Sequence, residues 1–204
     1  MAQSVGLPVS IGDYRPTIKD FSTCLDFRAG GIVKLGTANP FSGNFYFTAR
    51  IKWYGNNTAF QHIFSKRDSY GASTMMFDLY IDPTTNEVKL DNNVSSKNFA
   101  YILPKFKWVT LTWVHNTTDS LDQLFIDGVR VSNQASGTLG NGTTALVSVG
   151  AVEAGASEPF NGKIDEVVIG NPTTAPTWTE VVAMHAKYVY PTQWSYLKFD
   201  EGSG

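Results

Sequence analysis

Alternation of apolar and polar residues is the feature that most constrains the fold of this chain. Residues 44–53 place five apolar side chains on one face of an extended segment: Phe45, Phe47, Ala49, Ile51 and Trp53. Residues 107–114 repeat the alternation. A period of two is typical of a strand with one buried face, so both segments are predicted to be strands.

Short apolar runs separated by turn residues continue along the chain. Asp127-Gly128 stands between two such runs and predicts a hairpin, because both central positions of a type I′ turn need positive φ. Further strand candidates are residues 25–27, 32–35, 62–66, 75–81, 87–90, 124–126, 129–131, 146–150 and 163–169. Strands at such short intervals predict an all-β fold, a two-sheet antiparallel β-sandwich.

One segment near the carboxyl end has a helical pattern instead. Thr177 and Glu180 have the spacing of a capping box, in which each side chain bonds the backbone amide of the other residue. Residues 181–187 follow with helix-forming side chains. We therefore expect one short helix here.

Composition excludes several classes of protein. The 204 residues carry 16 Lys and Arg against 18 Asp and Glu, which argues against a nucleic-acid partner. The single Cys24 allows no intrachain disulfide and no zinc site built from several thiolates. No apolar window is long enough to span a membrane, and residues 1–8 lack the pattern of a secretory signal.

The polar surface is neutral rather than charged. Charged residues make up 17% of the chain, against roughly 25% in typical domains. Their place is taken by 20 Thr, 16 Ser and 13 Asn. Such a surface favours recognition or dense assembly over catalysis.

The order of the motifs resembles that of the laminin-G-like, concanavalin A-like jelly rolls, a class of two-sheet lectin and adhesion modules. The motifs that carry the resemblance are Leu25-Asp26-Phe27, residues 32–35, residues 45–53, Ile63-Phe64-Ser65-Lys66, residues 108–112, residues 124–128 and the signature at residues 160–169. The resemblance covers residues 23–204. Residues 1–22 are then expected to be an N-terminal arm.

Residues 194–204 depart from that order, because they look like the strand that begins such a domain. Three alternatives follow. A second repeat is cut after its first strand; or the domain is permuted, so that its own carboxyl end fills the first-strand slot; or the strand is donated to a neighbouring subunit. Donation would produce self-association through the terminal segments.

Catalytic residues are not expected. Glycoside hydrolases on this fold need two carboxylates facing one sugar bond. Asp165-Glu166 and Asp200-Glu201 are adjacent in sequence, and adjacent strand residues point to opposite faces. The three histidines lie in unrelated segments, and Cys24 is expected to be a buried, inert thiol.

A calcium ion is the cofactor that the resemblance implies. Jelly rolls of this class often hold one Ca²⁺ between a carboxylate of the signature strand and loop oxygens. By that resemblance Asp165 is the first candidate ligand, with Asp26 and Asp200 as partners. A carboxylate that accepts backbone amide bonds in a turn is the alternative interpretation of Asp165.

Aromatic residues in turns are candidates for ligand binding. Tyr54 beside Asn56, Tyr70 and Trp178 are expected to be exposed, where a ring stacks on a sugar and a neighbouring amide bonds its hydroxyls. The tryptophans at apolar positions of strands are expected in the core: Trp53, Trp108 and Trp113.

Together these features favour a non-enzymatic binding or structural module, exposed outside the cell or on a virion surface, in an adhesion or assembly role. Its partners are expected to be a glycan or a protein surface. A secreted carbohydrate-binding module of a larger glycan-processing protein is the alternative, and a glycoside hydrolase is the third.

Overall fold

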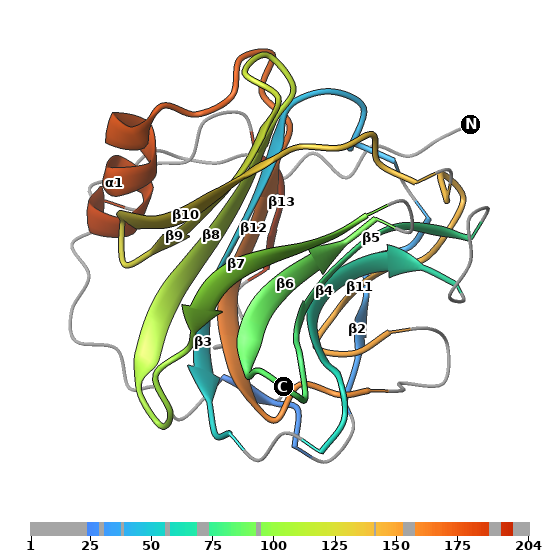
Figure 1. Ribbon diagram of the computed structural model, residues 1–204, viewed down its shortest axis with the longest axis vertical. Helices are drawn as coiled ribbons and strands as arrows, with labels where there is room; N and C mark the ends of the chain where they lie inside the picture. Colours follow the sequence, from blue (N-terminus) through green and yellow to red (C-terminus); the bar gives the residue numbers. More distant parts are fainter. Residues whose placement is uncertain are drawn as a thin grey trace, which may run out of the picture.

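The computed structural model of the chain describes residues 24–28, 31–37, 39–55, 58–68, 74–92, 95–140, 142–152, 158–187 and 193–197. Within them the protein is a sandwich of two antiparallel sheets with one helix against its outer side (Figure 1). The predicted fold class is confirmed.

Sheet A has seven strands and sheet B has six. Sheet A runs in the order β1 (Leu25–Asp26), β12 (Gly162–Gly170), β3 (Phe45–Trp53), β8 (Trp108–Asn116), β9 (Leu121–Ile126) and β10 (Val129–Ala135), and β13 (Gln193–Leu197) also pairs with β12. Sheet B runs in the order β2 (Val33–Lys34), β11 (Val147–Val149), β4 (Gln61–Arg67), β5 (Met75–Ile81), β6 (Glu87–Asp91) and β7 (Ser96–Ile102).

The core lies between the two sheets and is rich in aromatic rings. Phe47 of sheet A stacks on Phe64 of sheet B, with ring centroids 4.2 Å apart. Trp113 packs edge-on against Phe45 and Phe77, and all five rings are buried. The side chains at alternate positions of β3 and β8 therefore fill the sandwich, as their spacing predicts.

Local signals fix the hairpin and the helix where the sequence predicts them. Asp127 and Gly128 have φ values of 49° and 80°, as a type I′ turn requires. Helix α1 (Trp178–Lys187) begins with the capping box: the Thr177 amide donates to Glu180 Oε2 at 2.7 Å, and the Glu180 amide donates to Thr177 Oγ1 at 3.3 Å. Both predictions are confirmed.

Helix α1 covers part of the outer face of sheet A. Its buried side chains Val181 and Met184 pack on Tyr46, Val114 and Val168, which point away from the sandwich core. This second, smaller core holds the helix over one half of the sheet. The other half, around the carboxyl end of β3, is not part of that core.

Strands β1 and β13 share one edge of β12. Leu25 pairs with Ile164, and residues 193–197 pair with Val167–Gly170 within the same chain. The rest of the segment 194–204 and the whole expected arm 1–22 lie outside the described residues. The boundaries 1–22 and 23–204 and the three alternatives for the terminal strand stay predictions.

Three details correct the sequence-based interpretation. Strand β7 was not predicted, although Phe99 is buried and Tyr101 packs on the core. Trp108 is only partly buried, because Val109 and Leu111 occupy the inward positions of β8. Cys24 is partly exposed rather than buried.

Candidate functional site

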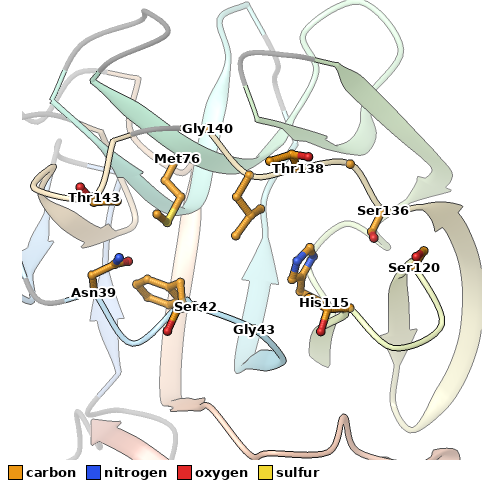
Figure 2. A pocket seen from close by; sticks show the side chains of 14 residues that line it. Asn39, Ser42, Gly43, Met76, His115, Ser120, Ser136, Thr138, Gly140 and Thr143 are labelled. Atoms are coloured by element: carbon orange, nitrogen blue, oxygen red, sulfur yellow. The ribbon is translucent and has the colours of Figure 1, made fainter.

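A groove with a volume of about 490 Å³ opens at one end of the sandwich. Figure 2 shows Asn39 and Ser42 on one side, Ser120 and Ser136 on the other, and His115 between them. Three segments build it: residues 39–43 before β3, the β8–β9 turn, and the crossing segment, residues 136–140 and 142–143, which lies between β10 of sheet A and β11 of sheet B.

Close backbone contacts hold the crossing segment in place. The Gly140 and Gly142 amides donate to the carbonyls of Met76 and Met75, at 3.0 and 3.2 Å. A Cβ atom at Gly140 would lie 2.2 Å from the Met75 carbonyl oxygen, so the approach requires glycine. The Asn92 side chain also donates to the Thr138 carbonyl at 3.1 Å. One wall of the groove is therefore fixed by the first residues of β5.

His115 forms part of the buried floor and is oriented by a carboxylate. Its Nδ1 lies 2.7 Å from Oδ1 of Asp122, which also accepts from the indole N–H of Trp113 at 3.1 Å. Lys97 Nζ donates to the other oxygen, Oδ2, at 3.0 Å. The ring also stacks on Phe45 with a centroid distance of 5.0 Å. Since Asp122 accepts from Nδ1, Nε2 of the neutral ring is the acceptor nitrogen.

The groove combines a buried floor with a rim of neutral hydrogen-bonding groups. Phe41, Met76 and His115 are buried at its base. The exposed rim side chains carry hydroxyls or an amide: Asn39, Ser42, Thr117, Ser120, Thr138 and Thr143. The lining residues that the structure describes include no Asp, Glu, Lys or Arg. Such a surface can bond a ligand rich in hydroxyls while the floor contacts its apolar face.

A second cluster of buried polar groups lies on β4 and β5. Arg67 donates to Oδ2 of Asp78 at 2.6 Å and to Oε2 of Glu158 at 3.2 Å. His62 Nε2 lies 2.8 Å from the same Glu158 oxygen. Burial lowers the pKa of His62, but the two carboxylates outweigh it and the pKa is raised. Contact with His62 in turn lowers the pKa of Glu158. The charges compensate one another, which is a structural role.

Of the candidate residues for ligand binding, the structure describes Tyr54 and Trp178. Tyr54 is partly buried under the Arg28 guanidinium, whose Cζ lies 4.9 Å from the ring centroid. Trp178 begins α1, is 61% exposed and donates its indole N–H to the Gly128 carbonyl at 3.2 Å. Asn56 and Tyr70 lie outside the described residues. The role of all four in ligand binding stays a prediction.

Of the candidate calcium ligands, the structure describes Asp165 and Asp26. Asp165 is buried, and its Oδ1 accepts from the Glu166 amide at 2.8 Å, at a bulge in β12. Asp26 is paired with the Arg28 side chain, and that pairing lowers its pKa. Asp200 lies outside the described residues. Over the described ranges, no three His, Cys, Asp or Glu side chains are close enough together to hold a metal.

The bulge in β12 removes one sequence-based argument against catalysis, namely that Asp165 and Glu166 must point to opposite faces of the sheet. Two residues of β12 are skipped between the pairs Asp165–Arg50 and Val168–Thr48, and Glu166 has a φ of 49°. Strict alternation therefore does not hold at Asp165-Glu166, and it cannot be the reason why this pair does not act together.

The sequence reasoning missed the pair of His115 and Asp122. Their signal was present, since a turn over residues 117–120 places residue 115 opposite residue 122 on the paired strands. The pair becomes visible only when the register of β8 against β9 is considered, because residue types alone do not show which residue lies opposite His115. Among the described residues, no helix is long and apolar enough to cross a membrane.

Solved structures with the same fold come from proteins of several kinds. Domain 4 of AbnA, a GH43 extracellular arabinanase from Geobacillus stearothermophilus solved with arabinotriose, has a TM-score of 0.57 and 15% identity, over 79% of this chain and 75% of that one. The CBM40 of the Ruminococcus gnavus IT-sialidase, bound to alpha2,3 sialyllactose, has a TM-score of 0.56 and 15% identity, over 73% and 84%. A heptameric SAP-like pentraxin from Limulus polyphemus has a TM-score of 0.57 and 16% identity, over 83% and 85%.

At these identities the likeness shows the fold alone. A search of curated proteins finds no relative of similar sequence. The family model Laminin_G_3, described as concanavalin A-like lectin/glucanases superfamily, matches residues 28–186. The expected resemblance is confirmed, and the chain belongs to this family of the concanavalin A-like lectin/glucanase superfamily.

Proposed function

We propose that this protein is a non-catalytic carbohydrate-binding module that works outside the cell and takes a neutral saccharide in the groove. The groove carries the proposal. Its rim of hydroxyls and amides surrounds a buried floor with one oriented imidazole. The structural neighbours support a saccharide ligand, since two of them were solved with arabinotriose, which is neutral, and with sialyllactose, which carries a carboxylate. Carbohydrate binding is thereby favoured over an adhesion or assembly role on a virion.

His115 is the residue expected to select hydroxyls. With Nδ1 held by Asp122, Nε2 accepts a hydrogen bond from a sugar hydroxyl. The orientation is fixed before binding, because Asp122 is itself held by Trp113 and Lys97. A fixed acceptor loses little conformational entropy when the ligand binds.

The lining favours binding over hydrolysis. Hydrolysis of a glycosidic bond requires two carboxyl groups that flank the bond. The described lining residues supply hydroxyls, amides, an imidazole and apolar side chains. They can orient a saccharide, and they offer no acid to protonate its leaving group.

Titration calorimetry with neutral oligosaccharides, arabinotriose among them, tests the proposal. The variant His115→Asn keeps a donor near Asp122 but removes Nε2, so binding is expected to weaken about tenfold. Ser136→Ala removes a hydroxyl in the groove, and Ser132→Ala on β10 is the matched control outside it.

The full chain is used for each titration, and melting temperatures are measured to verify the fold. Equal binding by wild type, His115→Asn and Ser132→Ala would mean that the saccharide binds elsewhere. Release of reducing sugar from any of the ligands would overturn the non-catalytic assignment.

A further inference from the structure

The half of sheet A that α1 leaves uncovered carries cations interleaved with aromatic rings. Lys52 of β3 is the register partner of Trp108 of β8, and its Nζ lies 5.9 Å from the centroid of the Tyr54 ring. The Arg50 guanidinium lies 5.8 Å from the Trp108 ring. These side chains alternate with the buried Ile51 and Val109, so they share the outer face of the sheet.

The loop after β7 extends this face with an exposed ring. Phe106 is 64% exposed, and its ring centroid lies 5.6 Å from that of Tyr54. Its φ of 61° is unusual for a bulky residue. The Phe106 amide donates to the Trp53 carbonyl at 2.6 Å, which keeps the loop against the end of β3. The fold therefore holds a large apolar ring in water in a strained conformation, a pattern that often marks a binding site.

Two lysines near the carboxyl end of β3 have ammonium groups that lie beside aromatic rings. In the ranges that the structure describes, the ammonium groups of Lys52 and Lys105 contact no carboxylate. Lys105 Nζ lies 5.6 Å from the Trp53 ring, and its side chain packs where a Cβ of Gly55 would stand. By contrast, the positive charge of Arg28 is balanced by Asp26. Lys52 lies beside the same Tyr54 ring that Phe106 contacts, and Lys105 precedes Phe106 in the chain, so both positive charges are close neighbours of this ring.

We propose that these residues form a second ligand site, specific for an anionic saccharide. The site, here called the cation–aromatic surface, consists of Arg50, Lys52, Tyr54, Lys105, Phe106 and Trp108. The apolar face of a sugar ring stacks on Phe106, and its carboxylate or sulfate pairs with Lys52 and Lys105. The choice of a saccharide rests on the proposed function, whereas the need for an anion rests on the lysines alone.

Two observations favour a saccharide over a nucleic acid. The whole chain has a net charge of −2, so it has no overall attraction for a long polyanion. Nucleic acid binding normally relies on a larger cationic excess and on several stacking rings. The cation–aromatic surface has one strongly exposed ring, which suits a short ligand.

Affinity is measured by calorimetry with oligogalacturonate, which carries carboxylates, dextran sulfate, which carries sulfates, and uncharged dextran. At least one anionic probe is expected to bind about tenfold tighter than dextran, and added salt should weaken it. Comparison of the two anionic probes tells whether carboxylate or sulfate is preferred. Equal affinity for all three would overturn the proposal.

Matched variants locate the site. Lys52→Gln is expected to weaken binding of the anionic probe about fivefold, and Phe106→Ala about tenfold. Phe106 is exposed, so its replacement leaves the core intact. Lys34→Gln removes the same charge from an exposed position of sheet B and should have no effect. Equal weakening by Lys34→Gln and Lys52→Gln would mean non-specific attraction and would overturn the site.

Two further measurements test the cation–aromatic surface independently of the groove. His115→Asn, in the groove, should leave binding of the anionic probe unchanged, so a failure of either site is recognised independently. An oligothymidylate that binds as tightly as the anionic saccharides would identify a nucleic-acid surface and overturn the choice of ligand.

Discussion

The carboxylate of Asp122 lies beneath the groove and joins the imidazole of His115 to the ammonium of Lys97, with contacts of 2.7 and 3.0 Å. All three side chains are buried. Lys97 comes from β7 of sheet B and Asp122 from β9 of sheet A, so the pair connects the two sheets. Its removal should therefore affect both the stability of the sandwich and the orientation of His115.

Replacing Asp122 by Asn is expected to lower the free energy of unfolding by about 3 kcal/mol, because the Lys97 charge remains buried without its counter-charge. Urea denaturation measures the change. Asp119→Asn, in the exposed turn of the same hairpin, is the control and should cost less than about 1 kcal/mol. The double variant Lys97→Met/Asp122→Asn should recover part of the lost stability, because the buried charge is then removed as well. If the losses of the two single variants simply add in the double variant, Lys97 and Asp122 are not energetically coupled.

Gly140→Ala is expected to destabilise the crossing segment. The added Cβ would lie 2.2 Å from the Met75 carbonyl oxygen and 2.9 Å from that of Asn92, and both are backbone atoms that cannot rotate away. We expect a loss of about 2 kcal/mol in urea denaturation, together with weaker saccharide binding in the groove.

Gly137→Ala is the matched control in the same segment. There the nearest atoms are the ends of flexible side chains, with Asn92 Nδ2 at 3.1 Å and Lys97 Nζ at 3.4 Å. Its loss of stability should be clearly smaller. Equal losses for the two variants would show that the contact with β5 does not hold the groove.

Features set by neighbouring residues could be predicted from the sequence. The Asp127-Gly128 turn and the Thr177 cap depend on a few adjacent positions, and both form as expected. Strand β7 was not predicted because its alternation is broken at the inward position of Lys97, a charged residue that is buried because it pairs with Asp122 and bonds the Ala135 carbonyl. A local pattern cannot supply a partner 25 residues away.

The candidate site depends on register and chain crossing rather than on local pattern. His115 and Asp122 meet because β8 and β9 pair in one particular register. The groove closes only when the crossing segment passes the start of β5 on its way from one sheet to the other. Trp108 was wrongly expected in the core for a related reason. The apolar residues of β8 lie on both faces of the sheet, so the sequence alone does not tell which of them point inward.

The capping box of α1 should contribute measurably to stability. Thr177→Ala removes the hydroxyl that accepts from the Glu180 amide at 3.3 Å, and a loss of about 1 kcal/mol is expected. Thr179→Ala, exposed in the first turn of the same helix, should be neutral or slightly stabilising. Thermal unfolding of both variants measures the difference, and identical melting temperatures would exclude a role for the cap.

A chain of hydrogen bonds under α1 should make stability depend on pH. The Thr48 hydroxyl donates to the Leu111 carbonyl, so it accepts from Thr112, which in turn accepts from Nε2 of His185 at 2.7 Å. His185 Nδ1 is then the unprotonated nitrogen, buried with no hydrogen-bond partner among the described residues. Burial lowers the pKa of His185 to about 4, although Asp127 opposes the shift.

The sign of the effect follows from proton uptake. Between pH 6.5 and about 4 the unfolded chain binds a proton at residue 185 that the folded protein excludes, so stability falls as the pH is lowered through this window. The loss is at most about 3 kcal/mol. Above pH 6.5 neither state is protonated there, and the contribution of His185 to the pH dependence vanishes.

His185→Gln isolates this contribution, because the amide can still donate to Thr112 but does not titrate. His62, whose pKa is raised, titrates equally in both proteins and cancels in the comparison. Urea denaturation at pH 7 and pH 4.5 should show that wild type loses more stability than the variant on acidification. Parallel losses in the two proteins would mean that protonation of His185 does not oppose the docking of α1.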